Sequence, residues 1–372
     1  MKKVLRLLAA LLVAVLLFSG CSLSAPVQES KNGEVAKRPN TIENFRLKVF
    51  LQEQNDEAKE NLFALYHAIM QFEETCYLPY PQPQEQVQSQ LSLLCYECPE
   101  LFQVDLTLPT SYLSYEGETE VIAVTFPYCM DKPTYDGLLA EAKSALSQFD
   151  TTGMTLLEAE KYIYDTLASQ ITYNASSTHS DNVYGALVEG HAKCDGIAKA
   201  MKWAMEAAGF SCMCVAGQPY GSGIGHAWNI IPVDGHYYHL DLTADVQYDT
   251  YREPMYPAYN VGSSFVLATY EPDPFFNIPT EQNMDASYHA RKGNFFHKDA
   301  DWESAIKKLF KDAYKNESSF SIQFASEADY TACLNNLEDL FREAARSANI
   351  TKWSWSTVCV DQYYLINITV KQ

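Results

Sequence analysis

From residue 41 onward, apolar positions recur along the chain at helical or strand spacing. Spacings of three and four residues predict helices, and alternation or short apolar runs bounded by turn residues predict strands. The predicted helices cover about 41–71, 85–94, 134–149, 155–171, 194–208, 301–314 and 327–348. The predicted strands cover 101–108, 119–126, 211–216, 226–233, 237–243, 320–324, 352–360 and 363–370. This mixture of helices and short strands indicates an α+β protein.

The first 20 residues have the pattern of a targeting signal. Lys2, Lys3 and Arg6 accompany an apolar run that ends at Phe18, and Ser19-Gly20-Cys21 follows. This pattern predicts a signal peptide over 1–20, because the run is short for a membrane span. Small residues before Cys21 resemble a bacterial lipobox, so we expect Cys21 to be lipidated. The polar segment 21–40 then predicts a flexible tether, and the protein is expected on the extracytoplasmic face of the cell membrane.

A break in the helical pattern at 150–153 predicts a domain boundary. Thr155 and Glu158 have capping-box spacing and start the next predicted helix. We therefore expect an N-terminal α+β domain over 41–150, a central domain over 151–262 and a C-terminal α+β domain over 263–372.

The composition limits the classes of partner. The chain has 372 residues, of which 47% are hydrophobic, and a formal net charge of −20. The apolar fraction is ample for packed cores, and the negative charge excludes nucleic acid and an electrostatically held membrane as expected partners. The predicted membrane contact is the lipid anchor alone.

Cys194 stands at the start of a predicted amphipathic helix in the segment GHAKCDGIAKAMKWAMEAAG. A helix that begins there directs its free backbone N–H groups and the positive end of its dipole toward the sulfur, which favours a nucleophilic thiolate. Two alternatives stay open at this point. Cys194 is a buried structural residue, or it forms a disulfide with Cys212 or Cys214.

A base and an acid for this thiol follow on two predicted strands. His226 begins one strand after a glycine-rich loop, and Asp241 lies on the next strand beyond the Asp234-Gly235 turn. Neighbouring antiparallel strands bring opposite side chains together, so we expect His226 to face Asp241. A thiol nucleophile, an imidazole base and an orienting carboxylate form a catalytic series.

These three motifs resemble the transglutaminase-like superfamily, of papain-like fold. The resemblance is carried by VYGALVEGHAKCDGIAKAMKWAMEAAG, GHAWNII and HYYHLDLTAD, which cover about 184–245. It implies that the Cys-bearing helix packs on an antiparallel sheet. It also implies that Cys194 is the nucleophile, His226 the general base and acid, and Asp241 the orienting carboxylate. The chain departs from many bacterial members at Ala244, where those members carry tryptophan.

The resemblance implies chemistry on amide bonds of protein or peptide substrates, cell-wall peptide among them, through a thioester that water or an amine resolves. The competing hypothesis is a non-catalytic surface or adhesion module on the same scaffold. No cofactor is expected, and a zinc site formed by His226, His236, His239 and Asp241 is disfavoured because His236 has the opposite strand parity. The backbone N–H of Cys194 is one candidate oxyanion donor, and Tyr184 and Gln170 are candidates for a second.

Overall fold

The computed structural model describes residues 41–221, 223–246, 254–298 and 300–372. The predicted signal peptide, the tether and the lipidation site Cys21 lie outside these ranges, as do residues 247–253. Among the helices that the structure describes, none is long and apolar enough to span a membrane.

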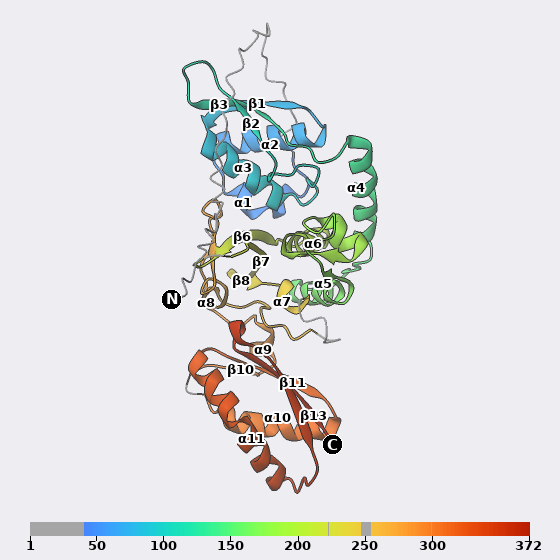
Figure 1. Cartoon of the computed structure of the whole chain (residues 1–372), viewed down its shortest axis with the longest axis vertical. Helices are drawn as coiled ribbons and strands as arrows, with labels where there is room; N and C mark the ends of the chain where they lie inside the picture. The colour runs from blue at the N-terminus through green and yellow to red at the C-terminus, as the bar shows by residue number, and fades with distance from the viewer. Residues whose placement is uncertain (1–40, 222, 247–253, 299) are drawn as a thin grey trace, which may run out of the picture.

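The first part of the chain folds helices against a small sheet at one end of the molecule (Figure 1). Its antiparallel sheet has the order β1-β3-β2. The elements are η1 (Phe45–Leu47), α1 (Val49–Gln52), α2 (Asp56–Met70), β1 (Thr75–Pro83), α3 (Gln84–Glu97), β2 (Ser111–Leu113) and β3 (Glu120–Thr125).

Two predictions for this part are wrong. The single helix predicted over 41–71 is interrupted, because the Asn55 side chain accepts the Ala58 N–H and starts a new helix. The strand predicted over 101–108 is not formed, and the proline-rich segment ahead of it forms β1 instead. β1 is an edge strand whose register with β3 is interrupted between Tyr77 and Gln82, and Pro79 and Pro81 lie in this interruption.

The central part packs helices against a second antiparallel sheet with the order β8-β7-β6-β9. Its helices are α4 (Lys132–Leu146), α5 (Leu156–Gln170), η2 (Gly185–Glu189), α6 (Cys194–Ala207), α7 (Thr243–Val246) and α8 (Ser263–Val266). Its strands are β4 (Thr172–Tyr173), β5 (His191–Ala192), β6 (Met213–Pro219), β7 (His226–Val233), β8 (His236–Leu240) and β9 (Tyr270–Pro272). The predicted capping box of Thr155 and Glu158 is present at α5. Because β9 pairs with β6, the central sheet continues past residue 262.

The last part places two long helices on one face of a third sheet, at the opposite end of the molecule (Figure 1). This sheet has the order β10-β11-β13-β12. The elements are α9 (Tyr288–Arg291), β10 (Phe295–Phe296), α10 (Trp302–Asn316), β11 (Ser319–Phe324), α11 (Glu327–Ser347), β12 (Ser354–Val360), η3 (Asp361–Tyr363) and β13 (Leu365–Lys371). The chain is thus a mixed α/β protein, and the domain limits given above stay a prediction.

Four charged side chains are buried where the first part meets α6. Lys202 Nζ lies 3.0 Å from Glu97 Oε1 and 2.8 Å from Glu206 Oε1. Lys48 Nζ lies 3.1 Å from Glu206 Oε2 and donates to the Glu97 carbonyl at 2.6 Å. We call these four residues the buried ion cluster. It fixes α6 against α3 and the segment ahead of α1, since an ion removed from water needs partners in place.

Candidate functional site

Cys194 is the first residue of α6, as the sequence predicts, and its side chain is buried. The chain enters the helix through a fixed backbone, because the Lys193 N–H donates to the Ser180 carbonyl at 2.8 Å. A Cβ atom at Gly196 would lie 2.6 Å from that same carbonyl, so only glycine fits at this position of the first helical turn. The Cys-Asp-Gly motif therefore has a packing reason in addition to any chemical one.

His226 and Asp241 lie together on the central sheet. His226 begins β7, and Asp241 follows the last residue of β8. The register pairs Asn229 with Leu240, which puts Asp241 across from Trp228 and on the same face as His226. His226 Nε2 lies 2.8 Å from Asp241 Oδ2. Because Nε2 donates to the carboxylate, Nδ1 is the imidazole nitrogen left to face the thiol.

The imidazole is polarised from two sides. Burial by itself lowers the pKa of His226, but the charge and hydrogen bond of Asp241 and a hydrogen bond with Cys194 outweigh it and raise that pKa to about 10. The imidazole therefore holds its proton at neutral pH. His226 contacts Asp241 directly, and Cys194 lies close enough to act on the pKa of the imidazole; we call Cys194, His226 and Asp241 the candidate triad.

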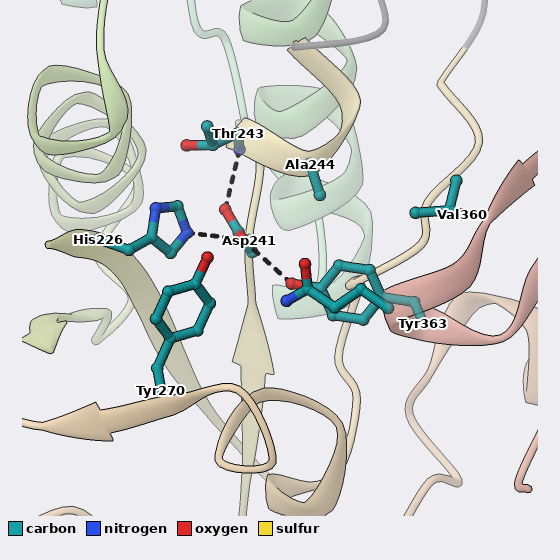
Figure 2. A pocket seen from close by; sticks show the side chains of 8 residues that line it. His226, Asp241, Thr243, Ala244, Tyr270, Val360 and Tyr363 are labelled. Carbon is teal, nitrogen blue, oxygen red and sulfur yellow. Dashed lines mark hydrogen bonds and ion pairs between the residues drawn. The ribbon is translucent and has the colours of Figure 1, made fainter. Parts of the chain in front are cut away.

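The Asp241 carboxylate receives two further hydrogen bonds (Figure 2). The backbone N–H of Thr243 donates to Oδ1 at 3.1 Å. The Tyr363 hydroxyl donates to Oδ2 at 3.2 Å, the same oxygen that His226 contacts. Tyr363 is buried and lies in η3, 122 residues further along the chain. Nothing in the sequence pattern indicates this contact, because residue 363 reads as the start of a strand.

An aromatic ring lies against the imidazole. The ring of Tyr270, from β9, stacks on His226 with centroids 4.8 Å apart. Burial raises the pKa of Tyr270, and Gln362, the residue before Tyr363, partly offsets this effect. These residues line a cavity of about 50 Å³ beside Asp241, whose walls are His226, Asp241, Thr243, Ala244, Tyr270, Val360, Gln362 and Tyr363. The small side chain at Ala244 leaves this space open (Figure 2).

The two side chains considered as second oxyanion donors are engaged elsewhere. The Tyr184 hydroxyl donates to Glu141 Oε2 at 3.0 Å, and Gln170 Nε2 donates to Gln148 Oε1 at 2.8 Å. Tyr173 lies closer to the thiol, since β4 pairs it with Ala192, two residues before Cys194. Burial raises the pKa of Tyr173, and the charges of Cys194 and Asp195 raise it further. Sequence reasoning missed Tyr173 because it lies on a two-residue strand.

The disulfide and zinc alternatives find no support in the part of the chain that the structure describes. Cys194, Cys212 and Cys214 are each free thiols there. No group of three His, Cys, Asp or Glu side chains is arranged to hold a metal ion among the described residues. His239 is buried and accepts the Trp228 Nε1–H at 2.9 Å, whereas His236 pairs with Glu281.

Known proteins resemble part of this chain. One solved structure, described as a TGase, has a TM-score of 0.26 and 12% identity, and the match covers 36% of this chain and 43% of that one. Another, described as a candidate cysteine protease from Cytophaga hutchinsonii, has a TM-score of 0.24 and 14% identity, covering 38% of this chain and 62% of that one. In both cases the match spans less than two thirds of the other chain's length.

No curated protein matches the chain. Residues 143–242 match the family model of the transglutaminase-like superfamily, a range that contains Cys194, His226 and Asp241. The central part of this mixed α/β protein is therefore transglutaminase-like, by its similarity to that superfamily.

Proposed function

We propose that the protein is a cysteine enzyme that acts on amide bonds of protein or peptide substrates, with Cys194 as nucleophile. The observation that carries this proposal is the His226 imidazole, which lies 2.8 Å from Asp241 and whose pKa is raised by Asp241 and by Cys194. A protonated imidazole and the N-terminal end of α6 both stabilise negative charge on the sulfur. The carboxylate fixes the ring and its tautomer.

The proposed reaction has two halves. The Cys194 sulfur attacks the amide carbonyl carbon, and the resulting oxyanion is stabilised by the Cys194 backbone N–H. The C–N bond breaks as His226 Nδ1 gives its proton to the leaving amine, which leaves a thioester. Water or a primary amine then attacks this thioester and gives its proton to His226. The C–S bond breaks, and the sulfur and the protonated imidazole are restored.

The test of the proposal is selective alkylation of the thiol. At about pH 6, iodoacetamide is expected to label Cys194 rapidly in the wild type, because the thiolate rather than the thiol reacts. The change His226→Ala removes the stabilising cation and is expected to slow this labelling by about tenfold or more. Peptide mass mapping after timed quenching measures the label at each cysteine.

Cys129 supplies an internal control in the same sample. Among the described residues it is the cysteine classed as exposed. Partial burial of its thiol and the charge of Asp105 raise its pKa. We expect it to stay unlabelled at this pH in both proteins. Labelling of Cys129 before Cys194 in the wild type, or a His226→Ala rate equal to the wild-type rate, contradicts the enzyme and favours the non-catalytic module.

Exposed apolar side chains on the segments that lead to the candidate triad suggest that the substrate carries apolar residues. Four of the exposed large hydrophobic residues lie on segments that lead into Cys194 or His226: Tyr173, Val188, Tyr220 and Ile224. Ile224 is 92% exposed two residues before His226. We propose that these side chains contact apolar residues of an extended peptide beside the bond that reacts.

The change Ile224→Ser is therefore expected to raise KM for a peptide substrate by about tenfold, the effect of losing one apolar contact. It should leave the alkylation rate of Cys194 unchanged, because the triad is intact. Leu108→Ser is the matched control, since Leu108 is an exposed leucine in the first part of the chain. Equal KM values for the two variants in steady-state assays contradict this recognition role.

The lipid anchor at Cys21 and the extracytoplasmic position remain part of the proposal on the grounds of sequence alone. Cell-wall peptide is the substrate that such a position would offer.

A further inference from the structure

One turn of the C-terminal part lies beside Tyr270 and Asp241, two residues that contact the His226 imidazole. η3 consists of Asp361, Gln362 and Tyr363. Gln362 lines the same cavity as Tyr270, whose ring stacks on the imidazole at 4.8 Å. Tyr363 donates its hydroxyl proton to Asp241 Oδ2 at 3.2 Å. A turn from the C-terminal part thus lines the cavity beside the ring and holds the carboxylate through Tyr363.

The turn is itself fixed to the C-terminal sheet. Gln323, buried in β11, donates through Nε2 to the Tyr363 carbonyl at 3.0 Å and to the Pro257 carbonyl at 2.8 Å. The Tyr330 hydroxyl, from α11, donates to the Asp361 carboxylate. These hydrogen bonds hold η3 in one position, and they thereby fix the position of the Tyr363 hydroxyl.

The hydroxyl and the imidazole share one carboxylate oxygen. Asp241 is 4% exposed, so little water competes for that oxygen. A donor to a carboxylate stabilises its charge and weakens it as an acceptor for its other partner. Tyr363 therefore limits how strongly Asp241 holds the imidazolium proton, and it also prevents the carboxylate from rotating away.

We propose that Tyr363 is a positioning residue of the candidate triad, through which the C-terminal part of the chain tunes the acid strength of His226. This inference rests on the proposed function and goes beyond it, because it assigns a role in the reaction to η3. Tyr363 acts through Asp241, the carboxylate to which its hydroxyl donates.

The test compares two changes of opposite sign at residue 363. Tyr363→Phe removes the donor and is expected to raise the pKa of His226 by about half a unit. Incorporation of a fluorinated tyrosine at 363, whose phenol is more acidic, keeps the size of the side chain and strengthens the donor, so it should lower that pKa. NMR titration of ¹³C-labelled histidine measures both shifts, and His226→Ala assigns the signal.

The turnover rate should also depend on the hydrogen bond from Tyr363 to Asp241. Tyr363→Phe is expected to lower kcat for a peptide substrate about tenfold with little change in KM, because the contact lies behind the triad and away from the substrate. Tyr66→Phe is the matched control, since the buried Tyr66 hydroxyl donates to a carboxylate oxygen of Glu100 at 3.0 Å in the first part of the chain. That control should lose stability and keep the His226 titration.

The outcomes separate the two proposals. Opposite shifts of the His226 titration support the role of Tyr363. No shift in either variant, or shifts of the same sign, overturn it, even where Tyr363→Phe lowers Tm. Should Tyr363→Phe fail to fold, the fluorinated tyrosine decides alone, because it keeps every contact. Wild-type Cys194 that alkylates no faster than Cys129 counts against the enzyme itself, independently of any change at residue 363.

Discussion

Cys194→Ala is expected to remove all but about a thousandth of the amide-bond turnover of the wild type, since a triad without its nucleophile keeps only the contribution of binding and oxyanion contacts. The sulfur lies at the end of α6, where its side chain is buried beside His226. Alanine removes one atom from this position and leaves the helix intact. Hydrolysis is measured as new amino termini on a protein substrate, and acyl transfer as incorporation of a biotinylated primary amine.

The matched change is Cys129→Ala, which removes an exposed thiol far from the triad in the sequence. Wild-type turnover in that variant, with a circular dichroism spectrum of Cys194→Ala equal to that of the wild type, assigns the loss to the nucleophile. Turnover by Cys194→Ala at a tenth of the wild-type rate or more would rule out a thioester at this position.

Asp241→Asn is expected to lower turnover by about a thousandfold while the protein still folds, because an amide no longer fixes the imidazole tautomer or stabilises the imidazolium. His226 Nε2 lies 2.8 Å from Asp241 Oδ2, so the substitution changes the charge of the partner with almost no change in shape. Alkylation of Cys194 should need a higher pH than in the wild type. The reason is that the His226 imidazolium of the variant loses its proton at a lower pH and no longer stabilises the thiolate. A wild-type profile in Asp241→Asn contradicts the assigned role.

The same variant tests the stability that the pair supplies. Interaction with Asp241 and Cys194 raises the pKa of His226 above its ordinary value of 6.5 to about 10. A group with a raised pKa in the folded state binds its proton more tightly there, so its stabilisation is complete below pH 6.5. It is lost as the pH rises through about 10. Urea unfolding should show the wild type losing its advantage over Asp241→Asn across this window, and a constant difference would contradict the pairing.

The helices of this protein were the most predictable elements, because their apolar faces and end residues agree. The capping box of Thr155 and Glu158 and the start of α6 at Cys194 lie where the sequence pattern predicts them. Strand β7 begins at His226 for a similar reason, since a glycine-rich loop precedes an apolar run. Local propensity and tertiary packing favour the same structure in these segments.

The first part of the chain was less predictable, because its elements depend on non-local pairing. The prolines at 79, 81 and 83 read as a helix stop, yet all three lie in an edge strand, the first two where its register with β3 is broken. The apolar residues of 101–108 read as a strand, but several of them fill the core from turns. Alternation alone does not distinguish these cases.

The residues of the candidate site also differ in how well the sequence predicts their position. Cys194, His226 and Asp241 stand in ordered motifs, so their proximity follows from a helix start and one hairpin. Tyr363 reaches the site from a different sheet, and no spacing in the sequence encodes a contact over 122 residues. Sequence alone therefore predicts which of these side chains lie near one another better than it predicts Tyr363, which contacts them from a distant segment.

The buried ion cluster limits how the parts of this protein can be exchanged. Lys202 and Glu206 belong to α6, which begins at Cys194, whereas Lys48 lies just before α1 and Glu97 ends α3, two segments that pack on α6. A different cover that lacked these counter-ions would bury unmatched charge, at a cost of about 3–5 kcal/mol. That cost approaches the whole stability of a small domain, about 5–15 kcal/mol. Helix α6 and the segments that pack on it are therefore expected to change in evolution only together, and a chimera that replaces one without the other should fail to accumulate in the cell.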